Sequence, residues 1–178
     1  MTSSAERLEG YYPGSGGRPH PGPASVDLPG AMRGAIVADL RAALPNEGCG
    51  LVIGDRVAGD GGRALRWIAL RNTSASPFRY ELDPSDLLRV TLEAEARGEE
   101  LWAIVHSHVA SPARPSPTDV RQSFYPDALY LLVSFDPAEA DASTGAESVR
   151  AWRILDGTVH EVAIAPEGAS PDRSESAR

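Results

Sequence analysis

The chain has 178 residues, a formal net charge of −8 and a hydrophobic content of 42%. This length predicts one domain, and the hydrophobic content is sufficient for a core. The acidic balance, with interspersed arginines and no basic run, argues against nucleic acid and anionic membranes as partners.

Three further absences narrow the class of protein. Cys49 is the single cysteine, so a disulfide framework and a zinc site of four cysteines are excluded. No apolar segment approaches the ~20 residues needed to span a bilayer. The N-terminus does not combine a basic region with an apolar one, so no signal peptide is indicated. We therefore expect a cytoplasmic protein without a membrane partner.

The two ends of the chain have the composition of tails. Residues 1–30 include a stretch rich in Gly, Pro and Ser, and residues 166–178 are polar and charged. We expect both segments to be disordered, around one domain at residues 31–165. His20 lies in the first tail and is not expected to bind a metal.

Apolar periodicity and turn residues predict the first elements of the domain. Apolar residues at helical spacing indicate a helix over residues 32–44, which Pro45 ends. A buried strand follows at residues 49–53, so Glu47 lies where that strand begins. Its antiparallel partner is expected at residues 64–71, across a glycine-rich turn.

A second helix is expected to begin at Asp83-Pro84 and to stop near Gly98. Its buried face is predicted to consist of Leu87, Leu88, Thr91, Leu92 and Ala94. A short helix begins near Pro117, and Asp156-Gly157 predicts a tight hairpin. The remaining strands are expected at residues 101–106, 128–135, 147–155 and 158–164. Together, these helices and strands predict an α/β domain in which helices flank a mixed sheet.

The segment from His106 to Asp119 contains the residue types of a hydrolytic metal site. His106 and His108 stand two apart at the end of a predicted strand, so both side chains point to one side and Ser107 to the other. Imidazoles bind zinc, and Asp119 can supply a third ligand if the loop folds back. A fourth position then remains for water, whose pKa zinc lowers to roughly 7.

Ser116 and Asp119 also fit a purely structural role. Serine at the N-cap, proline at the first helical position and an acid two residues later are typical of a helix start. Such a start is compatible with metal binding, because it would fix where Asp119 points. Whether Ser116 does more than cap a helix stays open at this point.

The spacing of His106, His108, Ser116 and Asp119 resembles the signature of the JAMM (MPN+) metallopeptidase family. That signature includes an upstream glutamate, and Glu47, followed by Gly-Cys-Gly-Leu, matches it. The resemblance implies a JAMM/MPN (deaminase-like) fold and Zn²⁺ bound by the two histidines and the aspartate. It further implies that Glu47 is the general base and that Ser116 donates a hydrogen bond to the developing oxyanion.

The resemblance extends over about residues 30–164. Segments 75–84, 115–119 and 125–134 are similar to a bacterial branch that acts on ubiquitin-like sulfur carrier proteins. This implies hydrolysis of the amide between a carrier's C-terminal glycine and cysteine, in cysteine biosynthesis. The expected partner is a carrier ending in Gly-Gly. Val109 departs from the proline or threonine common after the second histidine, which bears on substrate preference.

Three alternatives remain beside this interpretation. The first is a JAMM protease that trims a carrier precursor to expose Gly-Gly, and the second is a noncatalytic MPN scaffold. The third is a metal-storage or regulatory domain. Four further residues have weaker claims to a role: Ser107 as an oxyanion donor, Arg79 and Arg114 as contacts for a substrate carboxylate, and Cys49 as a small buried residue.

Overall fold

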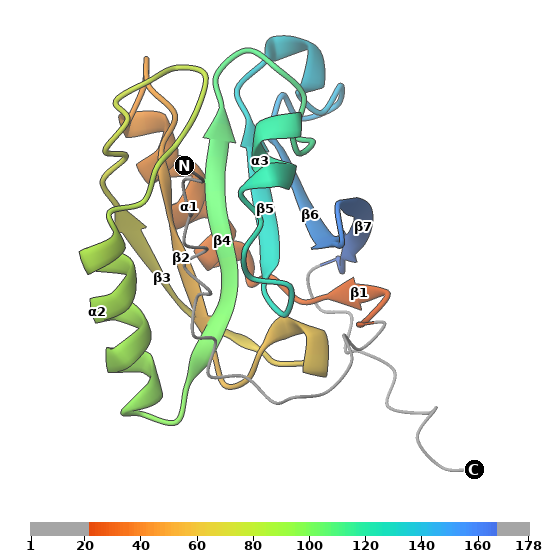
Figure 1. Cartoon of the computed structure of the whole chain (residues 1–178). Helices are drawn as coiled ribbons and strands as arrows, with labels where there is room; N and C mark the ends of the chain where they lie inside the picture. Colours follow the sequence, from red (N-terminus) through yellow and green to blue (C-terminus); the bar gives the residue numbers. More distant parts are fainter. Residues whose placement is uncertain (1–21, 167–178) are drawn as a thin grey trace, which may run out of the picture.

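The computed structural model describes residues 22–166, and within them the strands form one sheet in the order β1-β7-β6-β5-β4-β2-β3 (Figure 1). The strands are β1 (Ser25–Val26), β2 (Cys49–Gly54), β3 (Ala64–Leu70), β4 (Glu100–His108), β5 (Leu129–Ser134), β6 (Ser148–Leu155) and β7 (Thr158–Ile164). The helices are α1 (Gly30–Ala42), α2 (Pro84–Glu95) and α3 (Pro117–Arg121), with short 3₁₀ turns η1 (Ala58–Asp60) and η2 (Pro137–Glu139).

The sheet is mixed. β4 runs parallel to β5 and antiparallel to β2, while β5, β6 and β7 form an antiparallel series. The expected α/β class with helices on a mixed sheet is thus confirmed, and the predicted strands agree with the observed ones within two residues at each end. β4 lies inside the sheet, so its C-terminal end is flanked by strands on both sides.

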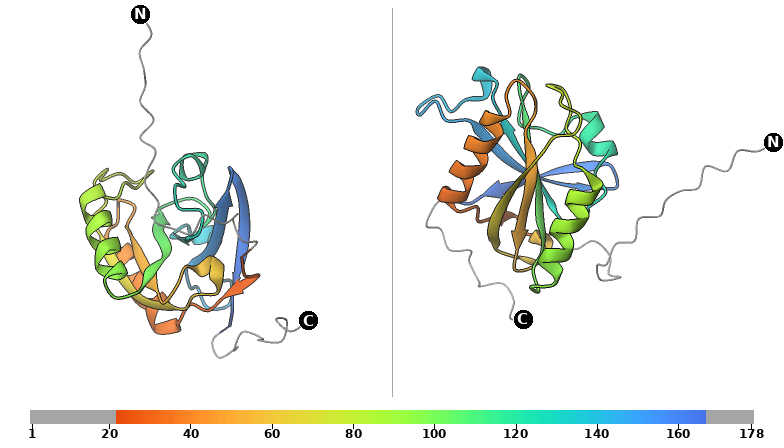
Figure 2. Two further views of the ribbon diagram at one scale, coloured as in Figure 1. Left: turned by 60° about the horizontal axis from the view of Figure 1, so that its bottom comes forward. Right: turned by 90° about the vertical axis from the view of Figure 1, so that its left-hand side faces the viewer.

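The sheet separates two hydrophobic cores. Ile36 and Leu40 of α1 pack on one face with Val105 of β4, whereas Val90 and Ala94 of α2 belong to the core of the other face. The right-hand view of Figure 2 shows α1 and α2 on opposite sides of the sheet. From Ala103 to Val105 successive β4 residues alternate between the cores, because strand side chains alternate in direction. Trp102 and Ala103 share the α1-side core, at an irregularity in the pairing of β4 with β2.

The buried face of α2 differs from the predicted one. Leu88 and Leu92 are 58% and 53% exposed, while Val90 and Ala94 are buried. Leu87 and Thr91 are half-buried, as residues three or four positions from the buried pair should be. The buried stripe of α2 is therefore rotated about the helix axis relative to the predicted one, and it is centred on Val90, which the predicted buried face did not include.

The start of the domain also differs. Residues 25–30 were assigned to the N-terminal tail, yet β1 pairs in parallel with β7 and Val26 and Leu28 are buried. Two apolar side chains among glycines and prolines are enough to join this segment to the sheet. Predicted tail residues 1–21 and 167–178 lie outside the described residues. Among the helices of residues 22–166, none has the length and apolar character needed to cross a membrane.

Candidate metal centre

The C-terminal end of β4 brings two imidazoles together. Ile104 belongs to the core on the α2 side, so His106 and His108, two and four residues later in the strand, lie on that side too. Their Nε2 atoms are 3.3 Å apart. Both side chains are buried. Ser107 points to the opposite side, where its hydroxyl accepts a hydrogen bond of 2.8 Å from the Gly48 amide. The alternation predicted from the sequence is therefore present.

Asp119 completes the cluster from the first turn of α3. Its Oδ1 lies 3.4 Å from His106 Nε2, and its Oδ2 lies 3.5 Å from His108 Nε2. The end of β4 and α3 are adjacent in Figure 1. We call His106, His108 and Asp119 the metal-ligand group, because within the described chain they form a buried set of donor atoms close enough to share one ion.

The spacing of this group fits a small divalent ion. Two metal–ligand bonds of about 2.0–2.1 Å at a tetrahedral angle place the ligand atoms roughly 3.3–3.4 Å apart. The two Nε2 atoms, 3.3 Å apart, match that value. The Asp119 carboxylate lies at a similar distance with a different oxygen near each ring, Oδ1 3.4 Å from His106 Nε2 and Oδ2 3.5 Å from His108 Nε2. Three protein ligands from one side leave a further coordination position, which is the arrangement of catalytic sites.

The tautomer of His108 and the lowered pKa of His106 both suit metal binding. His108 Nδ1 lies 2.6 Å from the Pro112 carbonyl oxygen, an acceptor that places the ring proton on Nδ1 and frees Nε2 for a metal. Burial lowers the pKa of His106 and so favours its neutral form. Burial acts in the same direction on His108, but Asp119 and the Pro112 carbonyl outweigh it and raise its pKa in the metal-free protein.

Helix capping orients the Asp119 carboxylate. The Ser116 hydroxyl accepts from the Asp119 amide at 3.2 Å, and Asp119 Oδ2 accepts from the Ser116 amide at 2.6 Å. This reciprocal capping box was the structural role expected for both residues. Burial raises the pKa of the Asp119 carboxyl, but hydrogen bonds to the two imidazoles and to Ser116 lower it by more than burial raises it. The net shift is downward, so Asp119 is ionised at neutral pH. Capping occupies the acceptor side of the Ser116 hydroxyl and leaves its proton free to be donated elsewhere.

Glu47 lies beside this group, two residues before β2, and is buried. Burial raises the pKa of its carboxyl from 4.5 to about 7, with His108 opposing and Asp119 adding to the shift. Cys49 of β2 pairs with His106 of β4, and the Ser107 amide donates to the Gly48 carbonyl at 3.0 Å, so the Glu47 backbone lies next to the end of β4. The chain thus brings together all five residues that the sequence nominated, from three separate segments.

The weaker candidates have other surroundings. Arg79 donates to the Ser74 hydroxyl at 2.7 Å within its own loop, and the exposed Arg114 lies over the Trp152 ring at 5.8 Å. The buried Cys49 thiol has its pKa raised to about 12, chiefly by burial, so it remains a neutral thiol. None of these contacts points to a role at the metal-ligand group.

Two residues near the cluster were not singled out from the sequence. Tyr80 stacks on His106 with ring centroids 4.1 Å apart, which orients an imidazole whose Nδ1 has no hydrogen-bond partner within the described residues. Asn72 donates to the Glu47 carbonyl oxygen at 2.9 Å. No local pattern marks either residue, because both act across long sequence separations.

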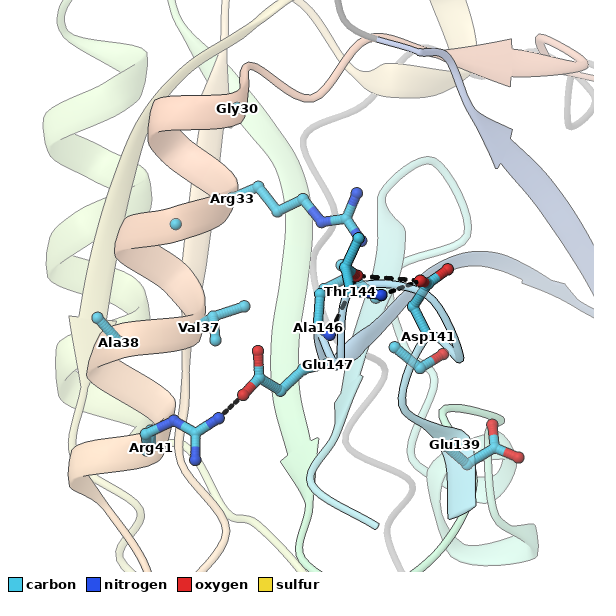
Figure 3. Close-up of a pocket in the computed structure, with 13 residues that line it drawn as sticks. Gly30, Arg33, Val37, Ala38, Arg41, Glu139, Asp141, Thr144, Ala146 and Glu147 are labelled. Carbon is cyan, nitrogen blue, oxygen red and sulfur yellow. Dashed lines mark hydrogen bonds and ion pairs between the residues drawn. The ribbon is translucent and has the colours of Figure 1, made fainter. Parts of the chain in front are cut away.

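A hollow of about 830 Å³ lies elsewhere on the molecule, between α1 and the segment that leads into β6 (Figure 3). It is lined by side chains of both charges, and an ion pair between Arg41 and Glu147 joins its two sides. It contains none of the five nominated residues. The candidate active site is therefore not this hollow but the separate metal-ligand group.

Comparison with known proteins identifies relatives of this arrangement. The chain is 38% identical over 128 residues to a CysO-cysteine peptidase of Mycobacterium tuberculosis, covering 71% of this chain and 81% of that protein. A probable TtuB-protein conjugate cleaving protease of Thermus thermophilus is 39% identical over 87 residues, covering 48% and 55%. A solution structure of a Desulfitobacterium hafniense protein matches with a TM-score of 0.66 and 33% identity, over 79% and 91% of the two chains.

A family model also matches most of the chain. The model describes prokaryotic homologs of the JAB domain and aligns with residues 29–155. That range contains the metal-ligand group, Glu47 and Ser116, and it agrees with the JAMM resemblance of the sequence. The chain belongs to the Prok-JAB family, the prokaryotic homologs of the JAB domain.

Proposed function

We propose that this protein is a zinc metallopeptidase that hydrolyses the amide between the C-terminal glycine of a ubiquitin-like sulfur carrier and cysteine. The observation that carries the proposal is the metal-ligand group, with its 3.3–3.5 Å spacing, beside the buried Glu47. The similarity to a CysO-cysteine peptidase over 71% of the chain supports the choice of substrate.

The donor set favours zinc among divalent ions. Two imidazoles and one carboxylate suit zinc, whereas magnesium and calcium prefer ligand sets made only of oxygen. Zinc bound there would polarise the scissile carbonyl and lower the pKa of a coordinated water. The residues of the chain then have to hold the ion, move a proton and stabilise negative charge.

Glu47 is proposed to move the proton. Its carboxylate accepts a proton from the attacking water and then donates it to the amine of the leaving cysteine, so that one amide bond breaks and no proton is lost. In the metal-free protein the pKa of Glu47 is about 7, near the pH at which a general base and acid is most efficient, and a bound cation favours the ionised carboxylate that accepts the proton. Ser116 donates its hydroxyl proton to the oxygen of the carbonyl as charge develops there.

The proposed substrate suits a buried site. A carrier that ends in Gly-Gly presents an extended tail without side chains, which can approach a narrow site by backbone recognition alone. The metal-ligand group is buried, with His106 fully enclosed and Asp119 only 6% exposed. A bulky side chain next to the scissile bond would have to displace this surrounding structure.

A second candidate function has a specific observation in its favour. The similarity to a probable TtuB-protein conjugate cleaving protease supports a protease that removes larger groups from a carrier's C-terminus. Trimming of a carrier precursor belongs to the same class. The chemistry is identical and only the leaving group differs.

The presence of all five nominated residues argues against the alternative of a noncatalytic scaffold.

Mass spectrometry of a carrier adduct tests the proposal. Purified, zinc-loaded protein is incubated with a ubiquitin-like carrier ending in Gly-Gly-Cys, and in parallel with a carrier extended by several residues and a carrier joined to a lysine side chain. Loss of a single cysteine residue from the first substrate, faster than cleavage of the others, is the expected result. Preferred cleavage of either other substrate would favour the second function, and no cleavage of any would overturn both.

A further inference from the structure

Asn72 lies two residues after the end of β3, and its side-chain amide makes four hydrogen bonds. Its nitrogen donates to the carbonyl oxygens of Glu47 at 2.9 Å and Arg79 at 3.1 Å. Its oxygen accepts from the amides of Ser74 and Glu81, both at 3.0 Å. An asparagine amide has two donors and two acceptor lone pairs, so its hydrogen-bonding capacity is filled.

These bonds connect two parts of the chain that are distant in sequence. One nitrogen contact reaches Glu47 across 25 residues, and the other three contacts lie within the loop that connects β3 to α2. We call this segment, residues 72–82, the Asn72 loop, since an isolated bridge between Asn72 and Leu82 closes it. In Figure 1 the connection from β3 to α2 lies at the same end of the sheet as the end of β4.

The Asn72 loop holds the Glu47 backbone on two sides. The Glu47 carbonyl accepts from Asn72, and the Glu47 amide donates to the Ser76 carbonyl at 2.9 Å. The same loop carries Tyr80, which stacks on His106. On the other side, the Gly48 amide donates to the Ser107 hydroxyl between the two histidines of β4. The Glu47 peptide is therefore held between the Asn72 loop and β4.

We propose that Asn72 is a positioning residue, which fixes the Glu47 backbone so that its carboxylate faces the metal-ligand group. This inference rests on the proposed role of Glu47 as the general base. The charged end of Glu47 is separated from its backbone by rotatable bonds, so a shift of the backbone moves the carboxylate. A misplacement of about 1 Å is enough to cost on the order of 10²-fold in rate.

The side chain of Asn72 offers a selective substitution. Asn72→Asp retains an oxygen that can accept from Ser74 and Glu81, so the turn of the loop keeps its bonds. It removes both donors and places negative charge against the Glu47 carbonyl. Thr73→Val is the matched control, because Thr73 donates to the Glu81 carbonyl at 3.1 Å in the same loop and does not contact Glu47.

The first measurement is steady-state cleavage of a carrier ending in Gly-Gly-Cys, together with zinc content. Asn72→Asp is expected to lower kcat about 10- to 100-fold at unchanged zinc content, and Thr73→Val to leave kcat unchanged. If Asn72 acts through Glu47, the double variant Asn72→Asp/Glu47→Gln is no slower than Glu47→Gln alone. Additive losses, or equal losses in both loop variants, would show a general effect on the loop and overturn the proposal.

The second measurement does not need activity. Hydrogen exchange of the Glu47 amide in the metal-free protein is expected to become at least about 10-fold faster in Asn72→Asp but not in Thr73→Val. A wild-type protein that cleaves no carrier would contradict the proposed function, whereas unchanged exchange would contradict the link from Asn72 to Glu47. Asn72→Ala, which adds no charge, repeats both tests if the aspartate variant does not fold. If neither variant folds, Asn72 is a requirement of the fold and the positioning role is overturned.

Discussion

The two halves of the proposed active site are built in different ways. The metal-ligand group comes from one stretch of chain, the end of β4 and the first turn of α3, with the loop between them. The Glu47 half comes from distant segments, because Asn72 and Ser76 hold Glu47 from the loop after β3 and Ser107 holds Gly48 from β4. Strand alternation and a helix cap set the first half, whereas long-range hydrogen bonds set the second.

Because the two halves are built from different residues, metal binding and proton transfer should be separable by substitution. Substitutions in the first half should remove the metal, and substitutions in the second half should leave the metal in place and slow the reaction. The predictions below use this contrast, starting with the change of largest effect.

Asp119→Ala is expected to abolish both metal binding and activity, because two imidazoles alone are a poor zinc site. Metal content after dialysis and cleavage of the carrier adduct measure the two losses. Asp83→Ala is a matched control, since Asp83 caps α2 by accepting from the Ser85 amide at 2.8 Å and lies outside the metal-ligand group. The control should lose about 1 kcal/mol of stability and retain the metal. A metal-loaded Asp119→Ala protein would remove Asp119 from the ligand set.

Glu47→Gln is expected to keep about one zinc ion per chain but to lower kcat on the order of 10²–10⁴-fold, because the amide cannot accept a proton. Zinc content and kcat should be measured on the same preparation. If this variant turns over at a near-normal rate, the general base is another group.

Ser116→Ala distinguishes the two roles of a residue that caps α3 and is also proposed to donate to the oxyanion. Loss of the cap alone would cost about 1 kcal/mol of stability and little activity. Loss of an oxyanion donor would lower kcat about 10²-fold or more, with folding and zinc content changed modestly. We expect the second pattern, read from melting temperature, zinc content and kcat together. A lower melting temperature at unchanged kcat would leave Ser116 with the cap alone.

The smallest expected effect concerns the stability of the metal-free protein. Because the folded pKa of Glu47 is raised from 4.5 to about 7, the folded state retains a proton in that window that the unfolded chain has released. Stability contributed by this group therefore falls as pH rises through the window. Glu47→Gln has no such proton, so its stability relative to wild type should rise by on the order of 2 kcal/mol between pH 4.5 and pH 8.

Urea denaturation with a chelator present, at both pH values, measures this difference. Titrating groups that are not coupled to Glu47 are common to both proteins and cancel, whereas His108 and Asp119 interact with Glu47 and contribute to the measured difference. A difference that does not change with pH would show that Glu47 is not a buried carboxyl of raised pKa.

The same contrast explains what the sequence could predict. His106, His108 and Asp119 were grouped correctly because their spacing and the helix start are local features that residue patterns reveal. Asn72 and Tyr80 were missed because their contacts cross the fold, and an asparagine in a polar turn is ordinary in a sequence. The roles of the five nominated residues remain predictions that the experiments above test.

The fold shows a similar limit. The strands and α1 followed from apolar runs and turn residues, but the face that α2 buries did not. Leu88 and Leu92 are more apolar than Ala94, yet they are exposed, because packing against the sheet decides which stripe of the helix is covered. β1 was missed since a strand of two residues has no periodicity to detect.

X-ray absorption at the zinc edge of the loaded protein tests the central claim most directly. The predicted spectrum contains two imidazole nitrogens and oxygen ligands at about 2.0–2.1 Å, and it is the same in wild type and Glu47→Gln. His108→Ala leaves two of the three ligands, so it should retain no zinc and give no zinc-edge spectrum. A sulfur neighbour at about 2.3 Å, which would indicate Cys49, or a ligand set that changes when Glu47 is replaced, would contradict the separation of metal binding from proton transfer.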